Sequence, residues 1–274
     1  MRALESIGLF KQLEDKKWSL NAMADLLREN NPNSQKKTAL SSIDDHRLWS
    51  QLTTAIQTGE SVFEKAYGSK IEEYVLSEPN YLQNMMARMR ENQAFCRHIT
   101  DVYDFNEFKH IVDIGGHDGS FLASILKKAL NAKGTVFDLE YAINNARKNR
   151  DIIELGNRVD LVAGDFFKAI PADGDCYIMK STLVDWDDEK AVQILKNIAC
   201  QMKTSSKLLI LEACIPESNE AHFSKILDVM IVLYCRGKFR TKSEFEKLFK
   251  AAGLRLNRIV PLGNEVYSVI EATL

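Results

Sequence analysis

A chain of 274 residues with 45% hydrophobic and 27% charged side chains can bury a core for one large domain, or for one medium domain with an appendage. The net charge of −2, from 36 basic and 38 acidic residues, gives no broad basic field that would attract nucleic acid or anionic lipid. The five cysteines form no C-x-x-C pair, which argues against a disulfide framework and a zinc site. We therefore expect a small-molecule partner, no nucleic acid, no metal ion, no membrane insertion and a reducing, cytoplasmic location.

Residues 1–104 are predicted to be mostly helical. Apolar residues recur there at helical spacing, for example at Met85 and Met89. Breaks between helices are expected at residues 30–33, which read Asn-Asn-Pro-Asn, and at Gly68.

Residues 105–274 show a different pattern, in which short β-rich runs alternate with longer amphipathic stretches. The runs are HIVDIGG, GTVFDLE, VDLVAGD, CYIMK and KLLILEA. Helices are expected after three of them, ending near Leu130, Arg150 and Lys203. This alternation predicts right-handed crossovers and a parallel sheet with helices on both faces. The fold class is therefore α/β for residues 105–274, with a helical region over residues 1–104.

The first crossover, VDIGGHDGS, carries the strongest chemical signal. A strand ends at Asp113, and Gly115, Gly116 and Gly119 follow before the next helix. Glycines let the backbone turn sharply and approach a ligand closely. A nucleotide-binding turn is one interpretation, and a tight turn without a ligand is the other.

Acidic residues follow the next two strands. Asp138 in VFDLE lies at the expected end of the next strand, where a carboxylate can accept hydrogen bonds from both hydroxyls of a ribose. Asp165 and Phe166 end VAGDFF and offer a carboxylate for an adenine amino group and a face for its ring. The alternatives are a turn cap for Asp165 and core packing for Phe166. Three strand ends together favour an adenosine cofactor.

The ordered segments VDIGG, VFDLE, GDFF, KSTLVDWDDEKAVQILKNI, KLLILEACIPE and GKFRTKSEFEKLFKAAGL resemble one family over nearly the whole chain. It is the S-adenosylmethionine-dependent O-methyltransferases of the caffeic acid and acetylserotonin type, with their bacterial polyketide-tailoring relatives. The resemblance implies a Rossmann-like class I methyltransferase domain and S-adenosyl-L-methionine as cofactor. The start of the chain is similar to the end of that family's winged-helix dimerisation region. We therefore expect a shortened, partial winged helix and a homodimer built on its exposed apolar faces.

The resemblance also implies cofactor contacts at six positions. Gly115 would face the methionine portion, Asp138 the ribose with Leu139 beside it, Asp165 and Phe166 the adenine, and Lys180 the polar tail. His117 stands where the family usually has a third glycine. We expect its side chain to point outward into solvent.

The catalytic segment departs from the family pattern. The family's general base is a histidine in a segment of the form L-H-D-W, and here Val184 occupies that position between Leu183 and Asp185. Valine cannot accept a proton. Of the two glutamates that orient the family's histidine, Glu212 matches one and Phe239 occupies the place of the other. Loss of the base together with one of its partners indicates a single functional change.

Three explanations of this change remain open. The protein methylates an oxygen of a small aromatic or polyketide-like molecule that is already acidic, or uses another base. It keeps the cofactor and performs other tailoring chemistry, such as decarboxylation, hydroxylation or a pericyclic step. It is a regulatory pseudoenzyme. The candidate replacement groups are Asp185, Glu212 and His222, although Asp185 could only stabilise a helix N-terminus and His222 could only be a solvated loop residue.

The acceptor pocket is expected to be apolar. Val184 would lie at its mouth, Met85 and Met89 would line it from the N-terminal region, and Met230, Leu233 and Tyr234 would close the other side. Methionine adapts well to flat aromatic ligands. Methionines at helical spacing also occur in ordinary cores, so both interpretations stay open.

Overall fold

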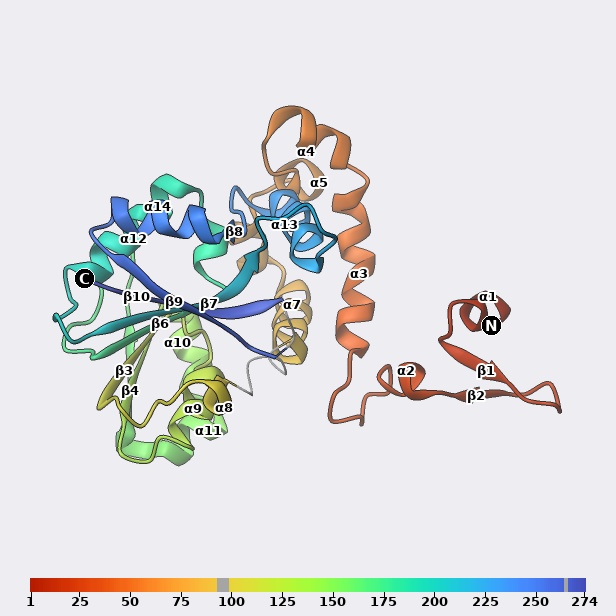
Figure 1. Cartoon of the computed structure of the whole chain (residues 1–274). Coiled ribbons are helices and arrows are strands. Elements are labelled where there is room, and N and C mark those ends of the chain that lie inside the picture. The colour runs from red at the N-terminus through yellow and green to blue at the C-terminus, as the bar shows by residue number, and fades with distance from the viewer. Residues whose placement is uncertain (93–98, 264–265) are drawn as a thin grey trace. The chain divides into compact units, whose positions relative to one another are not determined.

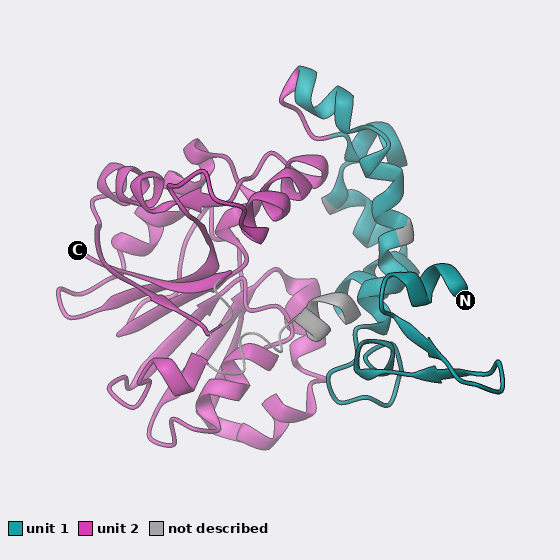
Figure 2. Ribbon diagram, turned by 45° about the vertical axis from the view of Figure 1, so that its right-hand side comes forward, with its two compact units in different colours: residues 1–57, 62–94 teal, residues 58–61, 95–274 magenta. Residues whose placement is uncertain are grey.

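The computed structural model describes residues 1–92, 99–263 and 266–274, with the side chains of Ile43, Glu72 and residues 87–92 outside the description. The chain divides into two compact units, which Figure 2 colours separately. The first holds residues 1–57 and 62–94, and the second holds residues 58–61 and 95–274. The predicted boundary between residues 104 and 105 lies within the second unit.

The first unit is mainly helical, with a small β-hairpin after its first short helix. Its helices are α1 (Arg2–Ser6), α2 (Ala22–Asp25), α3 (Lys36–Trp49), α4 (Leu52–Thr58), α5 (Phe63–Tyr67), α6 (Ile71–Ser77) and α7 (Pro79–Asn92). Gly68 ends α5 in the left-handed conformation, and residues 30–33 lie between α2 and α3, which confirms both predicted breaks.

The hairpin was not predicted. Strands β1 (Phe10–Gln12) and β2 (Trp18–Leu20) pair antiparallel, where only helix was expected. The charged segment between them forms the turn: Lys16 has a φ of +61°, and the Asp15 carboxylate accepts a hydrogen bond from the Lys17 amide at 3.2 Å. Strands of three residues are too short to give a clear alternating pattern.

Aromatic rings form the core of the helical part of this unit. Phe63 stacks on Tyr67 with ring centres 4.6 Å apart, Tyr67 lies 4.9 Å from Tyr74, and Tyr74 lies 5.2 Å from Tyr81. Such pairs add about 0.5–1.5 kcal/mol each beyond the area they bury. They connect α5, α6 and α7, while α3 packs along α7.

The second unit is built on one large sheet. Its strands are β3 (His110–Ile114), β4 (Lys133–Asp138), β5 (Val159–Ala163), β6 (Cys176–Lys180), β7 (Lys207–Ile215), β8 (Arg240–Thr241), β9 (Arg255–Pro261) and β10 (Tyr267–Thr273). The order is β5-β4-β3-β6-β7-β10-β9, with β8 paired to the end of β7. Strands β3 to β7 are parallel as predicted, but β10 runs antiparallel between β7 and β9.

Helices cover both faces of this sheet. They are α8 (Ile99–Val102), α9 (Ser120–Leu126), α10 (Glu140–Ala146), α11 (Arg150–Leu155), α12 (Asp188–Ala199), α13 (Phe223–Tyr234) and α14 (Lys242–Ala251). Figure 1 shows α12 and α14 on one side of the sheet and α8 to α11 on the other. Two apolar clusters fill the layers, one around Leu122 and Ile125 of α9, the other around Ile194 of α12 and Phe245 of α14.

One predicted helix is two helices. The stretch expected to run through Arg150 ends at Ala146, and α11 begins at Arg150. Asn149 causes the break, because its side chain accepts a hydrogen bond from the Asp151 amide at 3.0 Å and donates one to the Asp118 carbonyl at 2.7 Å.

The strand order determines where a ligand can bind. From β3 the chain moves outward to β4 and β5, then returns to place β6 on the other side of β3. In open α/β sheets ligands bind at the carboxyl ends of the strands at such a reversal. Strands β3 and β6 are nearly completely buried, as expected for central parallel strands covered on both faces.

Candidate cofactor and acceptor site

The turn after β3 approaches its neighbours closely. Gly115 has a φ of +72°, and a β-carbon there would lie 2.8 Å from the Thr182 Oγ1. Its amide donates a hydrogen bond to the Phe137 carbonyl of β4 at 2.8 Å. The position therefore requires glycine both for its backbone angle and for space. The turn lies between the carboxyl ends of β4 and β6, the two strands that flank β3.

His117 is part of this turn, and its side chain is 30% exposed. Its φ is +53°, a conformation that costs a residue with a β-carbon about 1 kcal/mol. Its amide donates to the Asp138 Oδ2 at 2.8 Å, and its Nδ1 lies 4.0 Å from the Asp118 Oδ1. Burial opposes ionisation of Asp118, but contacts with His117 and Ser120 hold the pKa of that carboxyl below its usual range.

Asp138 ends β4 beside the turn. Its Oδ2 accepts the His117 amide, and its Oδ1 accepts the Leu139 amide at 2.6 Å. Burial raises the pKa of this carboxyl, while the two amides lower it. A carboxylate has about four acceptor positions, so about two remain for a ligand. Leu139 is exposed beside it.

Asp165 and Phe166 follow β5. Asp165 caps a turn and Phe166 packs against other aromatic rings, which are the alternatives to adenine binding named above. The Asp165 Oδ1 accepts the Phe167 amide at 2.9 Å, and its Oδ2 lies 3.5 Å from the Lys168 Nζ. The ring of Phe166 packs edge to face against Phe167 and Trp186. The Gly164 amide donates a hydrogen bond to the Asp138 carbonyl at 2.9 Å, so the end of β5 lies beside the end of β4. The half-buried Phe166, two residues later, therefore stands at the same edge of the sheet as Asp138.

Asp113 and Lys180 lie beneath the glycine turn. Asp113 is 1% exposed, and its Oδ2 has no hydrogen-bond partner among the described residues. A β-carbon on Gly116 would lie 2.8 Å from that oxygen, so the carboxyl sits directly against the turn. Burial raises the pKa of Asp113 to about 7, with Lys180 opposing the shift. The Lys180 Nζ lies 5.7 Å from the centre of the Phe121 ring.

The turn after β6 carries Val184, which is 2% exposed. The Val184 amide donates to the Glu212 Oε1 at 2.8 Å. Glu212 is completely buried, and its Oε2 has no partner among the described residues. Burial raises the pKa of Glu212 to about 7, while Arg240 opposes the shift.

An apolar cluster surrounds Val184. We call it the Val184 cluster, and its buried members are Val184, Ala213 and Phe239. Half-buried side chains packed against it are Ile215, Leu227, Ile231 and Val266. Val184 occupies the position of the family's base, and Phe239 occupies the position of one of its orienting glutamates. Both therefore belong to the same hydrophobic cluster.

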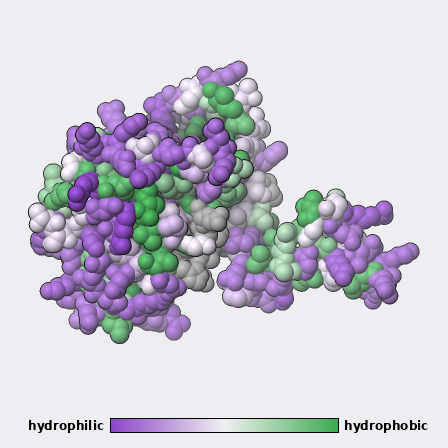
Figure 3. All heavy atoms as spheres, viewed as in Figure 1, coloured by the Kyte–Doolittle hydropathy of each residue, from purple (hydrophilic) through white to green (hydrophobic). Residues whose placement is uncertain are grey.

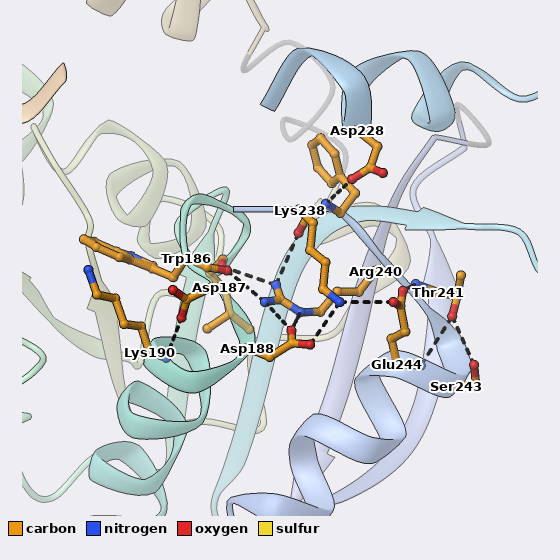
Figure 4. A network of polar contacts seen from close by, with 12 residues as sticks. Trp186, Asp187, Asp188, Lys190, Asp228, Lys238, Arg240, Thr241, Ser243 and Glu244 are labelled. Atoms are coloured by element: carbon orange, nitrogen blue, oxygen red, sulfur yellow. Dashed lines mark hydrogen bonds and ion pairs between the residues drawn. The ribbon is translucent and has the colours of Figure 1, made fainter. Parts of the chain in front are cut away.

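Arg240 supports the same turn, and sequence reasoning missed it. The guanidinium is completely buried, and Figure 4 shows it beneath the turn that carries Trp186. It donates to the Trp186 carbonyl at 2.9 Å and the Leu183 carbonyl at 3.4 Å, and forms an ion pair with Asp188 at 2.9 Å. In the sequence, its place next to Phe239 was the signal that could have drawn attention to Arg240. That signal is weak, because arginine is rarely fully buried.

Gly237 and Asp228 complete the support of this turn. A β-carbon on Gly237 would overlap the Val184 carbonyl and the backbone of Asp185. The Asp228 Oδ1 accepts the Phe239 amide at 2.8 Å, which ties the segment to α13, and burial raises the pKa of Asp228. The turn at Val184 is therefore held by Glu212, by Arg240 and by close backbone packing.

The remaining predicted site residues fall in several places. Asp185 is exposed, and Asp187 rather than Asp185 caps the N-terminus of α12. His222 caps α13, with its Nδ1 2.6 Å from the Ser224 Oγ, so it is not merely a solvated loop residue. Met230 is half-buried on α13, where Leu233 and Tyr234 are buried. Met85 lies half-buried on α7 of the first unit, and the Met89 side chain falls outside the described residues.

Comparison with known proteins decides the family. The O-methyltransferase domain model matches residues 49–255. The chain belongs to the S-adenosylmethionine-dependent O-methyltransferase family. It is 34% identical to the phenazine O-methyltransferase PhzM of Lysobacter antibioticus, over 99% of this chain and 80% of that protein. The resemblance and the Rossmann-like class I methyltransferase fold are thereby confirmed.

Two solved structures extend the comparison. The mitomycin 7-O-methyltransferase MmcR superposes with a TM-score of 0.89 at 30% identity, covering 99% of this chain and 81% of that one. The O-methyltransferase NcsB1 from neocarzinostatin biosynthesis, in complex with S-adenosyl-L-homocysteine and 1,4-dihydroxy-2-naphthoic acid, gives 0.84 at 27% identity over 99% and 83%. These family members act in the synthesis of small aromatic natural products.

Proposed function

We propose that this protein transfers the methyl group of S-adenosyl-L-methionine to an oxygen of a small aromatic or polyketide-like molecule. The observation that supports it best is the carboxylate of Asp138. It is held by two backbone amides at the carboxyl end of β4, and about two of its acceptor positions remain unused. A ribose with two neighbouring hydroxyl groups matches that capacity.

The rest of the cofactor fits the neighbouring strand ends. Gly115 and Gly116 pack closely over Asp113, whose Oδ2 has no partner among the described residues and suits a hydrogen-bond-donating group, such as an amino acid ammonium. Leu139 and Phe166 offer apolar surface for a purine. When bound, the cofactor supplies an electrophilic methyl group on a positively charged sulfur.

On this proposal the residues of the chain position the reactants. Asp138 and the glycine turn hold the donor, and the Val184 turn forms the wall that the acceptor meets. Val184 stands at the position of the family's base. The protein then contributes orientation and exclusion of water, which can supply several powers of ten in rate without proton transfer by a side chain.

The homodimer and the cytoplasmic location belong to the same proposal. Exposed apolar side chains gather on the N-terminal segment, where Figure 3 shows green atoms among purple ones: Leu4, Ile7, Leu13, Leu20 and Met23. A second copy would bury such a surface. No helix in the described parts of the chain is long and apolar enough to cross a bilayer, and the four cysteines described there are unbridged.

The test is methyl transfer from labelled cofactor to a panel of phenols, aromatic carboxylic acids and hydroxylated polyketides. We expect a methyl ether or ester and one S-adenosylhomocysteine for each product. Asp138→Ala should lower kcat/KM by at least about tenfold, the value of one lost charge-assisted hydrogen-bond acceptor. The control is Asp160→Ala, which removes an exposed carboxylate near the other end of β5. Equal losses in both variants would contradict the assignment of Asp138.

A second candidate follows from the Val184 cluster. If the cofactor binds but no acceptor gains a methyl group, the apolar wall indicates other tailoring chemistry or a regulatory protein. Conversion of a substrate without formation of S-adenosylhomocysteine would favour the former, and binding without conversion would favour the latter.

A further inference from the structure

We propose that the acceptor carries an acidic hydroxyl group, ionised at neutral pH before it binds, and that none of the described side chains of the second unit removes its proton. This rests on the proposed function, because it names the class of substrate for the same site. An acidic phenol, conjugated to an electron-withdrawing ring nitrogen, carbonyl or nitro group, has this chemistry.

The first support is the character of the wall. Val184, Ala213 and Phe239 pack against one another with exposures of 6% or less, and their side chains contain no proton acceptor. The half-buried residues around them are also aliphatic. A hydroxyl group placed against this wall finds hydrocarbon.

The second support is the position of Glu212. This carboxyl is in contact with the wall, because its Oε1 accepts the Val184 amide. It is 0% exposed, and Val184 beside it is 2% exposed. The Thr182, Leu183 and Val184 amides and Arg240 stabilise its ionised form against burial. Glu212 therefore holds the turn and has no open path to an acceptor.

The third support is that three other described titratable groups near the wall, His222, Asp228 and Lys238, already hold contacts of their own. His222 is bound to Ser224 at the start of α13, and Asp228 accepts the Phe239 amide. Lys238 forms ion pairs with Asp188 at 2.9 Å and Glu244 at 3.2 Å. Asp185 is exposed, and an ordinary carboxylate is about six pKa units too weak to deprotonate an ordinary phenol of pKa about 10.

The chemistry balances without a base. A lone pair of the acceptor oxygen forms the new C–O bond, the C–S bond breaks, and its electron pair stays on sulfur. The phenolate and the sulfonium neutralise each other, and no proton moves in this step. At pH 7 only about one in a thousand molecules of an ordinary phenol is ionised, whereas an acceptor about three pKa units more acidic is about half ionised.

The experiment measures kcat/KM against pH for a set of phenols of similar shape that differ in acidity through a ring substituent. We expect each profile to rise tenfold per pH unit and level off at the pKa of that acceptor. At pH 7 the acidic members should exceed the ordinary ones by about a hundredfold or more, following their ionised fraction. Profiles that share one inflection whatever the acceptor would overturn the proposal, since they would reveal a base on the enzyme.

A pair of variants sharpens the test. Val184→His with Phe239→Glu places an imidazole and an orienting carboxylate in the wall, and should raise kcat/KM for ordinary phenols at pH 7 by at least about tenfold. Acidic phenols should gain less than about threefold, because they have no proton to lose. The matched control, Val184→Asn with Phe239→Gln, adds polarity without a base. An equal gain in both double variants would contradict the inference.

The outcomes separate the two proposals. Transfer with an enzyme-borne inflection leaves the methyltransferase function intact and removes only the acidic-acceptor inference. No transfer to any acceptor between pH 6 and 9, from protein that binds S-adenosylhomocysteine in a calorimeter, overturns the proposed function and this inference with it.

Discussion

The two halves of the sheet edge use their polar groups in opposite ways. At the ends of β3 and β4, Asp138 keeps acceptor positions unused, and one oxygen of Asp113 has no partner in the described parts of the chain. At the ends of β6 and β7, Glu212 and Arg240 are completely buried and bind the backbone of the intervening turn. Asp138 keeps acceptor positions for a ligand, whereas Glu212 gives one oxygen to the turn and keeps its Oε2 buried, without a partner among the described residues.

This difference shows that the same residue types do not imply the same function. Glu212 resembles a catalytic glutamate by its place in the sequence, yet its contact in the structure is the Val184 amide. The buried Glu212 carboxyl and the buried Arg240 guanidinium hold this turn from two sides and keep it in a single conformation. We infer that they position the acceptor wall rather than act on the acceptor.

The largest expected effect is at Gly237. Gly237→Ala brings a β-carbon into the Val184 carbonyl, so the turn must move or the protein must unfold. We expect a loss of more than about 4 kcal/mol in the free energy of unfolding, measured by urea titration. Gly253→Ala is the control, because a β-carbon there meets nothing within 4 Å and costs only the strain of its positive φ, about 1 kcal/mol. Similar losses in the two variants would show that the contact at Gly237 is easily relieved.

Arg240→Met should come next. The change leaves the Leu183 and Trp186 carbonyls without their donor and Glu212 without its nearest counterion. We expect about 3 kcal/mol of lost stability. Arg236→Met is the matched control, since Arg236 is exposed, and should change stability by less than about 0.5 kcal/mol. A loss of that small size at Arg240 would mean that the buried cation does not support the turn.

Glu212→Gln should alter how stability depends on pH. The pKa of Glu212 is raised to about 7 in the folded protein, so the folded state keeps a proton that the unfolded chain releases. The stability contributed by the protonated group is therefore complete below about pH 4 and is lost as pH rises to about 7. The wild type should lose about 3 kcal/mol more than Glu212→Gln across this window. Parallel curves from thermal unfolding at pH 4, 5.5 and 7.5 would place the raised pKa elsewhere.

The smallest effect is expected at His117. The turn imposes a φ of +53°, which glycine adopts without strain, and the amide that binds Asp138 is retained in either residue. His117→Gly should therefore change stability by less than about 1 kcal/mol and S-adenosylhomocysteine affinity by less than about threefold. His117→Ala keeps the strain and is the control. A large loss of affinity in both would assign the imidazole itself to the cofactor site.

The sequence predicted the parts of the fold that depend on local pattern. Continuous apolar runs followed by Asp113 and Asp138 identified the strands and their polar ends, because parallel strands covered on both faces are apolar throughout. The antiparallel insertion of β10 was missed, since strand order depends on contacts between distant segments. The three-residue strands of the hairpin were too short to show a period.

For the candidate site too, the sequence predicted what depends on local pattern and not what depends on contacts between distant segments. Spacing and motif order identified Asp138 and Val184, whose positions follow directly from strand ends. The sequence could not show that Asp165 caps its own turn, that Glu212 faces inward or that Arg240 is fully buried. Those properties depend on which side chains meet in three dimensions, and the same residue types are usually exposed.

The most direct measurement of the contrast between the two halves is calorimetric titration of S-adenosylhomocysteine into the wild type and Asp138→Ala. We predict one binding site per chain in the wild type and an affinity lowered at least about tenfold in the variant, because the ribose loses its charged acceptor. The heat of binding and the thermal unfolding of the variant are recorded together, so that a folding defect is recognised. A folded wild type that binds no S-adenosylhomocysteine, or a variant that binds it as tightly as the wild type, would contradict the assignment of this half of the sheet edge to the cofactor.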